Sequence, residues 1–328
     1  MQRPSPERTL QRLEWTVIRR LDGLLQGDYR TLFQGFGLDL ADLREYQFAD
    51  DVRRIDWNVT ARMQETYVRH YLEDRELTAW FLLDVSPSVD FGTVRVSKRD
   101  LLSDFVGVLA RLLTRHGNRV GAILYDGAAV HVIPAAGGRL QVLRLLDELQ
   151  RLPHPERTPP TDLSVPLEVA GRSIRRRSLV FVVSDFISTP GWPKPLALLG
   201  RRHEVLAVRL CDPREIELPE IGPVFFQDAE TGEQLYLDTH DRGFRRRFLE
   251  AVGRRQRELE EGFRAGGVDA LELSTEGDLV REILRFAALR KKRRATPSSA
   301  ARPAAVARSA AGPPPAAEDP DKQREEGV

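Results

Sequence analysis

The sequence predicts an α/β protein: a doubly wound, mostly parallel sheet, preceded by a helical and irregular N-terminal extension and followed by a disordered C-terminal tail. Two short apolar runs, 79–83 and 178–184, are typical of strands buried on both faces of a parallel sheet. From residue 79 onward, such runs alternate with segments of helical periodicity, which is the pattern of a Rossmann-like sheet. The 328 residues, of which 41% are hydrophobic, suffice for one large domain with additions at both ends.

The first segment, 1–77, divides into a helix and a stretch of mixed charges and aromatics. Apolar residues recur at helical spacing between 7 and 25, which predicts an amphipathic helix that ends at Gly27. Between 35 and 76, charges of both signs surround Trp57; they are Asp50, Asp51, Arg53, Arg54, Asp56 and Arg62. We interpret this pattern as internal ion pairing, with a partner-binding surface as the alternative. The interspersed acids disfavour a nucleic-acid site.

The α/β domain is expected to span 78–290. Its predicted strands are 79–85, 119–125, 128–133, 178–184, 204–210 and 268–273, with 119–125 and 128–133 forming a hairpin. Its predicted helices are 97–116, 140–152, 161–175, 195–202, 241–265 and 277–289. A second, small hairpin is expected from 224–226 and 234–237. The segment 291–328 combines Ala, Pro, Ser and charge without periodicity, which predicts a disordered tail.

The composition disfavours several classes of function. A net charge of +1 gives no general attraction to nucleic acid or to anionic membranes. Cys211 is the single cysteine, so an internal disulfide is excluded, a Cys-based zinc site is disfavoured, and a small buried apolar role is expected. No run approaches the roughly eighteen apolar residues of a membrane span, and the charged N-terminus is unlike a signal peptide. We therefore expect a cytoplasmic protein.

Oxygen-bearing side chains gather where the two central strands end. Asp84, Ser86 and Ser88 follow the first strand, and Asp185 follows the second. Ligands of open α/β sheets bind at the carboxyl ends of strands, so we expect these side chains to converge if the strands are neighbours. Thr161, at the start of a predicted helix, can point its hydroxyl to the same place or cap the helix. Such hard oxygen ligands suit Mg²⁺ or Mn²⁺, whereas the first three residues taken alone also fit an ordinary turn.

The sequence DVSPS at 84–88, with Thr161 and with Asp185 after an apolar strand, resembles the metal-ion-dependent adhesion site of von Willebrand factor A domains. In that family two serines and the threonine bind Mg²⁺ directly or nearly so, and the aspartates act mostly through water. The resemblance assigns the first role to Ser86, Ser88 and Thr161, and the second to Asp84 and Asp185. Such a site leaves one metal position open, and a carboxylate from another protein can fill it.

The upstream stretch LREYQFADDVRRIDWNVTAR is similar to the signature of the bacterial domain-of-unknown-function-58 family, and the similarity extends from about residue 23 to about residue 286. The family signature usually has Pro-Gly where this chain has Phe48-Ala49, which predicts a different local turn. Pro87 and Val89 occupy variable positions of the site loop. Members of the family are commonly associated with MoxR-type AAA+ ATPases. The resemblance therefore implies an adaptor that works with such an ATPase in the assembly or activation of client proteins.

The sequence lacks the motifs of several enzyme classes. GxxxxGK[ST], GxSxG and HExxH are absent, and the six histidines are scattered. A Mg²⁺-dependent phosphohydrolase stays open as an alternative because Mg²⁺ with hydroxyls can polarise phosphate, although no base is identifiable. A structural scaffold with a vestigial metal site is the third interpretation. We favour a non-enzymatic, metal-dependent protein-binding adaptor.

Overall fold

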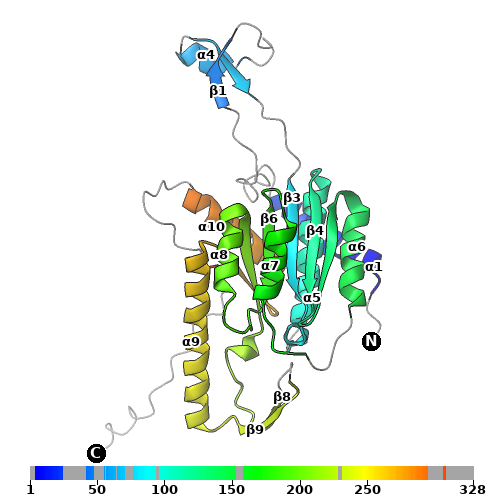
Figure 1. Cartoon of the computed structure of the whole chain (residues 1–328), viewed down its shortest axis with the longest axis vertical. Coiled ribbons are helices and arrows are strands. Elements are labelled where there is room, and N and C mark those ends of the chain that lie inside the picture. Colours follow the sequence, from blue (N-terminus) through cyan, green and yellow to red (C-terminus); the bar gives the residue numbers. More distant parts are fainter. Residues whose placement is uncertain are drawn as a thin grey trace, which may run out of the picture.

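A computed structural model of the chain describes residues 4–24, 42–47, 55, 57–63, 65–70, 77–93, 96–152, 158–227, 231–294 and 306–307. In this part of the chain a central sheet carries helices on both faces, and a small β-α-β unit stands apart from it (Figure 1). The predicted fold class, a doubly wound and mostly parallel sheet, is confirmed.

The central sheet has the strand order β11-β10-β7-β6-β3-β4-β5. Its strands are β3 (Thr78–Asp84), β4 (Arg119–Tyr125), β5 (Val130–Ala136), β6 (Leu179–Ser184), β7 (Glu204–Cys211), β10 (Asp269–Ser274) and β11 (Val306–Ala307). Every neighbouring pair is parallel except the hairpin of β4 and β5. The two central apolar runs of the sequence are therefore direct neighbours, β3 and β6, with Leu83 opposite Val183.

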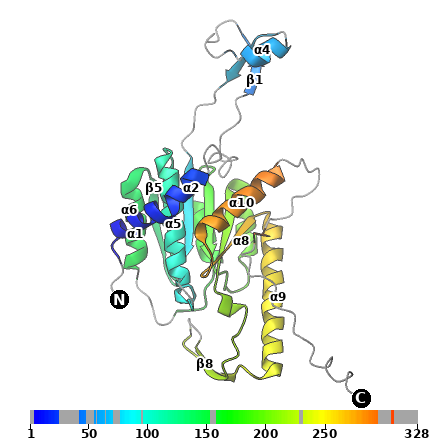
Figure 2. The ribbon, with the colours of Figure 1, turned by 180° about the vertical axis from the view of Figure 1, so that it is seen from behind.

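Helices cover the sheet on both sides, as the alternating sequence pattern predicts. Figure 2 shows the face covered by α5 (Lys98–Arg115), α6 (Gly138–Arg151), α10 (Leu279–Arg294) and the N-terminal helices. The opposite face carries α7 (Ser164–Ser173), α8 (Pro193–Arg202) and α9 (Arg242–Gly266) (Figure 1). Helix α5 begins with a capping box, because Ser97 Oγ accepts the Asp100 N–H while the Asp100 carboxylate accepts the Ser97 N–H.

Two apolar clusters, one on each face, hold the layers together. The side chains of β3 alternate between them, so Phe81 and Leu83 belong to the cluster under α5 while Leu82 belongs to the cluster under α7 and α8. Phe81 stacks on Phe181 of β6 with ring centroids 5.1 Å apart, and Phe105 of α5 meets Phe181 edge-on. Strands buried on both faces in this way fix the positions of the loops at their ends.

The predicted N-terminal helix is present but interrupted. It consists of α1 (Pro6–Leu13), a five-residue π-helical segment (Glu14–Ile18) and α2 (Arg19–Leu24). The apolar face packs as expected through residues such as Leu10 and Leu13, which are fully buried. Trp15 is 61% exposed, and the guanidinium of Arg19 lies 3.5 Å from the centroid of its ring. At about 100° per helical residue, Trp15 lies about 140° around the helix from Leu10, so it points away from the buried face.

The charged and aromatic stretch before the sheet forms β1 (Asp42–Glu45), α4 (Trp57–Met63) and β2 (Tyr67–His70), with β1 antiparallel to β2. Trp57 is 69% exposed, so its ring is not enclosed, while the ion pairing that we expect around it stays a prediction. Of the charged residues assigned to that cluster, only Arg62 is described; Asp50, Asp51, Arg53, Arg54 and Asp56 lie outside the described residues, as do Phe48 and Ala49.

The C-terminal part contains a separate hairpin, helix α10 and a last short strand of the central sheet. Strands β8 (Pro223–Gln227) and β9 (Gln234–Asp238) form the predicted small hairpin, which lies near the carboxyl ends of the central strands (Figure 1). Helix α10 continues to Arg294, and within the predicted tail 291–328 the description otherwise covers only β11, which pairs with β10. The remaining tail residues lie outside the described part. Among the helices of the described residues, none has the length and apolarity needed to cross a membrane.

Candidate metal site

The ends of β3 and β6 lie side by side and are joined by a buried hydrogen bond. Asp84 is the last residue of β3 and Ser184 the last of β6. Ser184 Oγ donates to Asp84 Oδ2 at 2.7 Å, and both residues are almost fully buried. The sequence therefore places a carboxylate at the expected edge of the sheet, next to a hydroxyl that we did not single out.

The loop after β3 brings the two predicted serine hydroxyls together. The Ser86 N–H donates to Asp84 Oδ1 at 3.0 Å, and a short 3₁₀ turn, Pro87–Asp90, follows. Ser86 Oγ and Ser88 Oγ are 3.2 Å apart, and the two residues are 0% and 6% exposed. The carboxylate of Asp84 thus holds the loop that follows it, and the conformation of this loop brings the hydroxyls of Ser86 and Ser88 together.

The loop after β6 presents Asp185 through a strained backbone. Phe186 has φ +56°, a left-handed conformation that non-glycine residues rarely adopt. Its N–H donates to Ser184 Oγ at 2.8 Å, and its buried ring packs against Trp192 and Phe263. The Ile187 N–H then donates to Asp185 Oδ1 at 2.9 Å. Packing of the Phe186 ring offsets the strain, and the turn that results fixes the Asp185 carboxylate.

Thr161 is 1% exposed and lies in a segment that is tied to the loop after β6. The Thr189 N–H donates to the Thr161 carbonyl at 2.8 Å, and the Leu163 N–H donates to Ser188 Oγ at 3.0 Å. Helix α7 begins only at Ser164, whose N–H donates to Asp162 Oδ1 at 2.9 Å. Leu163, and not Thr161, occupies the N-cap position of α7, so Thr161 does not stand at the start of the helix, where we expected it.

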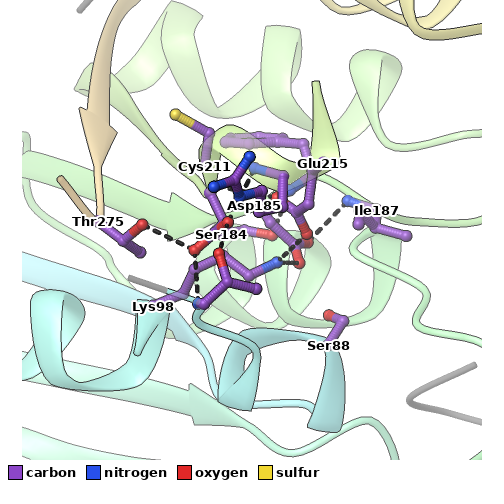
Figure 3. Close-up of polar contacts among 12 residues, drawn as sticks. Ser88, Lys98, Ser184, Asp185, Ile187, Cys211, Glu215 and Thr275 are labelled. Carbon is purple, nitrogen blue, oxygen red and sulfur yellow. Dashed lines mark hydrogen bonds and ion pairs between the residues drawn. The ribbon is translucent and has the colours of Figure 1, made fainter. Parts of the chain in front are cut away.

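Two charged residues that the sequence did not reveal complete the surroundings of Asp185 (Figure 3). Lys98 Nζ donates to Asp185 Oδ2 and to Glu215 Oε1, both at 2.7 Å. Lys98 is fully buried, although lysine is rarely so. The capping-box sequence Ser97-Lys98-Arg99-Asp100 marks a helix start, but nothing in it indicates which loops the two basic side chains reach.

A third carboxylate near this edge, Asp212, differs from Asp84 in its electrostatics. Burial alone would raise the pKa of Asp212, but hydrogen bonds from Thr93, Arg214 and Thr275 hold it below its ordinary value. Burial, followed by the charge of Asp185, raises the pKa of Asp84 from 3.8 to about 6 despite its hydrogen bonds. Asp212 is satisfied by the protein itself, whereas ionised Asp84 remains a buried charge that a cation would stabilise.

The donor set fits a hard divalent cation. Two hydroxyls in contact and two aspartates offer only oxygen, which Mg²⁺ and Mn²⁺ prefer. Elsewhere in the described part of the chain, as here, no group of three or more His, Cys, Asp or Glu side chains is arranged to hold a metal ion. A metal at this site would therefore depend on the serine and threonine hydroxyls and would carry few protein charges.

The sequence matches a known protein family over most of its length. The family described as "Protein of unknown function DUF58" matches residues 42–258. The uncharacterized proteins Mb1516 of Mycobacterium bovis and Rv1480 of Mycobacterium tuberculosis are both 38% identical over 289 residues, covering 88% of this chain and 91% of theirs. The uncharacterized protein MAV169 of Mycobacterium avium is 34% identical over 160 residues, covering 49% of this chain and 94% of its own.

Solved structures with a similar backbone include an aerotolerance-related membrane protein of Bacteroides fragilis, with 13% identity, coverage of 65% of this chain and 99% of that chain, and a TM-score of 0.42. BatB of Bacteroides thetaiotaomicron has 12% identity, coverage of 66% and 99%, and a TM-score of 0.40. A von Willebrand factor type A protein of Catenulispora acidiphila has 11% identity, coverage of 70% and 44%, and a TM-score of 0.36. At such identities the likeness concerns the fold alone.

Proposed function

This chain belongs to the DUF58 family, and we propose that it is a non-enzymatic adaptor in which Mg²⁺ or Mn²⁺ binds at the ends of β3 and β6 and receives a carboxylate from another protein. The observation that carries the proposal is the pair of buried aspartates, Asp84 and Asp185, beside the converging hydroxyls of Ser86 and Ser88. The mutual repulsion of the two carboxylates is the energy that a bound cation would offset.

The five proposed residues would take two different roles at the metal ion. Ser86, Ser88 and Thr161 would hold the ion through their hydroxyls, and Asp84 and Asp185 would hold it mostly through water. When bound, the ion supplies an open, electron-accepting coordination position. The hydrogen bonds of Asp84 to the Ser86 N–H and the Ser184 hydroxyl keep the serine loop in place before any metal arrives. The proposed activity is binding, because no general base has been identified beside the site.

The family resemblance supplies the partner in this proposal. We assign the adaptor to the cytoplasm and to a MoxR-type AAA+ ATPase, with which it would assemble or activate client proteins. Either the ATPase or the client offers the carboxylate that completes the metal site. No binding of nucleic acid is proposed, since the chain carries a net charge of only +1.

The first test measures metal binding on the purified protein. Titration with Mn²⁺, followed by the electron paramagnetic resonance signal of free Mn²⁺, should show one site in the wild type and none in the double variant Ser86→Ala/Ser88→Ala. Asp147→Ala is the matched control, because Asp147 is a part-exposed residue of α6 that pairs with Arg151 at 3.0 Å. Equal Mn²⁺ binding by the double variant and the wild type would contradict the assigned ligands.

The second test measures partner binding. Wild type, Asp84→Ala and Asp147→Ala are used as baits in native lysate, each with Mg²⁺ and with EDTA, and bound proteins are identified by mass spectrometry. We expect an AAA+ ATPase that is retained by the wild type and the control only when Mg²⁺ is present. Identical partners under all conditions would refute metal-dependent binding and favour a scaffold. Hydrolysis of a phosphoester that requires Asp84 would instead support a phosphohydrolase.

A further inference from the structure

A buried cation is built into the proposed metal site. Lys98 is 0% exposed, and its ammonium lies 2.7 Å from Asp185 Oδ2 and 2.7 Å from Glu215 Oε1 (Figure 3). The side chain of Glu215 is 26% exposed, so this carboxylate lies between the buried site and solvent. One ammonium therefore neutralises part of two carboxylates that belong to different loops.

The position of Lys98 is fixed by its place in the fold. It is the first residue of α5, directly after the capping residue Ser97, and its N–H donates to the Phe91 carbonyl at 2.9 Å. Burial alone would lower the pKa of Lys98, but Asp185 and Glu215 raise it above its ordinary value, so the side chain stays charged. On the other side, Glu215 Oε2 accepts the Asp212 N–H at 3.1 Å, which orients Glu215 toward the lysine.

The charge of this group decides how a divalent ion would be held. Asp84, Asp185 and Glu215 with Lys98 carry a total of −2, with the nearby Arg255 left out of the sum. Without the lysine the total would be −3, so the ion would be held more strongly. A carboxylate from a partner would then meet an excess of negative charge. Arg255, whose charge also interacts with Asp185 and Glu215, contributes equally in both cases.

We propose that Lys98 is the residue that makes this site depend on a partner. By pairing with Asp185 and Glu215 it weakens metal binding, so the bound ion keeps positive charge that attracts the carboxylate of a partner. This inference rests on the metal site of the proposed function. It makes Lys98 a positioning and charge-setting residue rather than a ligand, and it assigns an electrostatic role to Glu215.

The inference predicts opposite effects of one substitution. Lys98→Met keeps an unbranched side chain, shorter by one heavy atom, and removes the charge, so Mn²⁺ affinity should rise by about tenfold or more. Acetate, used as the simplest carboxylate, should bind the Mn²⁺-loaded variant at least about tenfold more weakly than the wild type. A lysine with a purely structural role would give a disordered site in which metal and acetate both bind less well.

A charge series separates the electrostatic role from folding. Glu215→Gln leaves a total of −1, the wild type and the double variant Lys98→Met/Glu215→Gln both have −2, and Lys98→Met has −3. We expect Mn²⁺ affinity to follow this order, with the double variant close to the wild type. Mn²⁺ affinity is read from the paramagnetic resonance of the free ion, and acetate binding from the loss of water-proton relaxation. Circular dichroism and thermal unfolding check the fold of each variant.

Each outcome has a defined meaning. The expected ranking, with opposite changes for Mn²⁺ and acetate in Lys98→Met, supports the inference. If the wild type binds Mn²⁺ but Lys98→Met binds it more weakly, the inference is overturned. The same holds if Glu215→Gln leaves the Mn²⁺ affinity unchanged. In both cases the metal site itself is not contradicted. Absence of Mn²⁺ binding by the folded wild type overturns the proposed function itself. If Lys98→Met does not fold, the comparison of Glu215→Gln, the double variant and the wild type still decides the ranking.

Discussion

Asparagine at position 84 is expected to stabilise the metal-free protein at neutral pH and to abolish its stabilisation by metal. Burial, followed by the charge of Asp185, raises the pKa of Asp84 from 3.8 to about 6, which corresponds to about 3 kcal/mol between the two protonation states. Asparagine removes the charge and keeps an oxygen for the Ser86 N–H. It gives up the acceptor of the Ser184 hydroxyl, at about 1 kcal/mol. The net gain above pH 7 is therefore about 2 kcal/mol.

The sign of the pH dependence follows from the direction of the pKa change. The folded state binds the Asp84 proton more tightly than the unfolded state, so the wild type has its full contribution below pH 3.8 and loses it as the pH rises through about 6. Asparagine does not titrate. Between pH 4.5 and pH 8 the free energy of unfolding of the wild type should fall by about 2 kcal/mol relative to Asp84→Asn.

Urea unfolding in the presence of EDTA, followed by circular dichroism across this pH range, measures the difference. Asp147→Asn is the control, because it makes the same change at a part-exposed carboxylate of α6 that pairs with Arg151. In a second set of unfolding curves, recorded at pH 7.5, Mg²⁺ should raise the free energy of unfolding of the wild type and the control but not that of Asp84→Asn. Parallel pH profiles for the wild type and Asp84→Asn would refute the claim that Asp84 is a destabilising buried charge.

Three other residues give simpler tests. The thiol of Cys211 is buried and its pKa is raised to about 12, so iodoacetamide at pH 8 should alkylate it at least about 100-fold more slowly in the native protein than in urea, by mass spectrometry. Burial lowers the pKa of His203, so the stability of the wild type should fall between pH 7.5 and 5.5 in urea titrations, and that of His203→Phe should fall less. Arg99 donates to the Val85 carbonyl at 2.6 Å and pairs with Asp90, so Arg99→Met should lower the free energy of unfolding by about 3 kcal/mol, and Arg99→Lys by less.

The strands and the proposed ligands could be predicted because their signals are local. An apolar run that ends in Asp-Val-Ser-Pro-Ser identifies a buried strand and its polar loop, and a second run that ends at Asp185 identifies the neighbouring strand. The sequence left open whether the two strands are neighbours, and the structure shows that they pair directly. The start of the helix after Thr161 was harder to place, because only the structure shows that α7 begins at Ser164.

Residues whose environment depends on distant segments could not be predicted. Lys98 has the sequence context of a solvated lysine in the first turn of a helix, and its burial depends on Glu215, which lies 117 positions further along the chain. Trp57 was expected inside a cluster of ion pairs, but it lies on the surface of a small unit whose other elements are short.

Two adjacent basic residues at the start of α5 hold three loops at the ends of the sheet. Successive helical residues point about 100° apart, which lets Arg99 reach the loop after β3 while Lys98 reaches the loops after β6 and β7. Both side chains are almost fully buried, so removing either one leaves polar groups without their partner. The three loops are thus coupled through one rigid helix end. Substitutions at 98 and 99 should therefore change metal binding by different routes, charge for Lys98 and loop geometry for Arg99, although neither residue supplies a ligand.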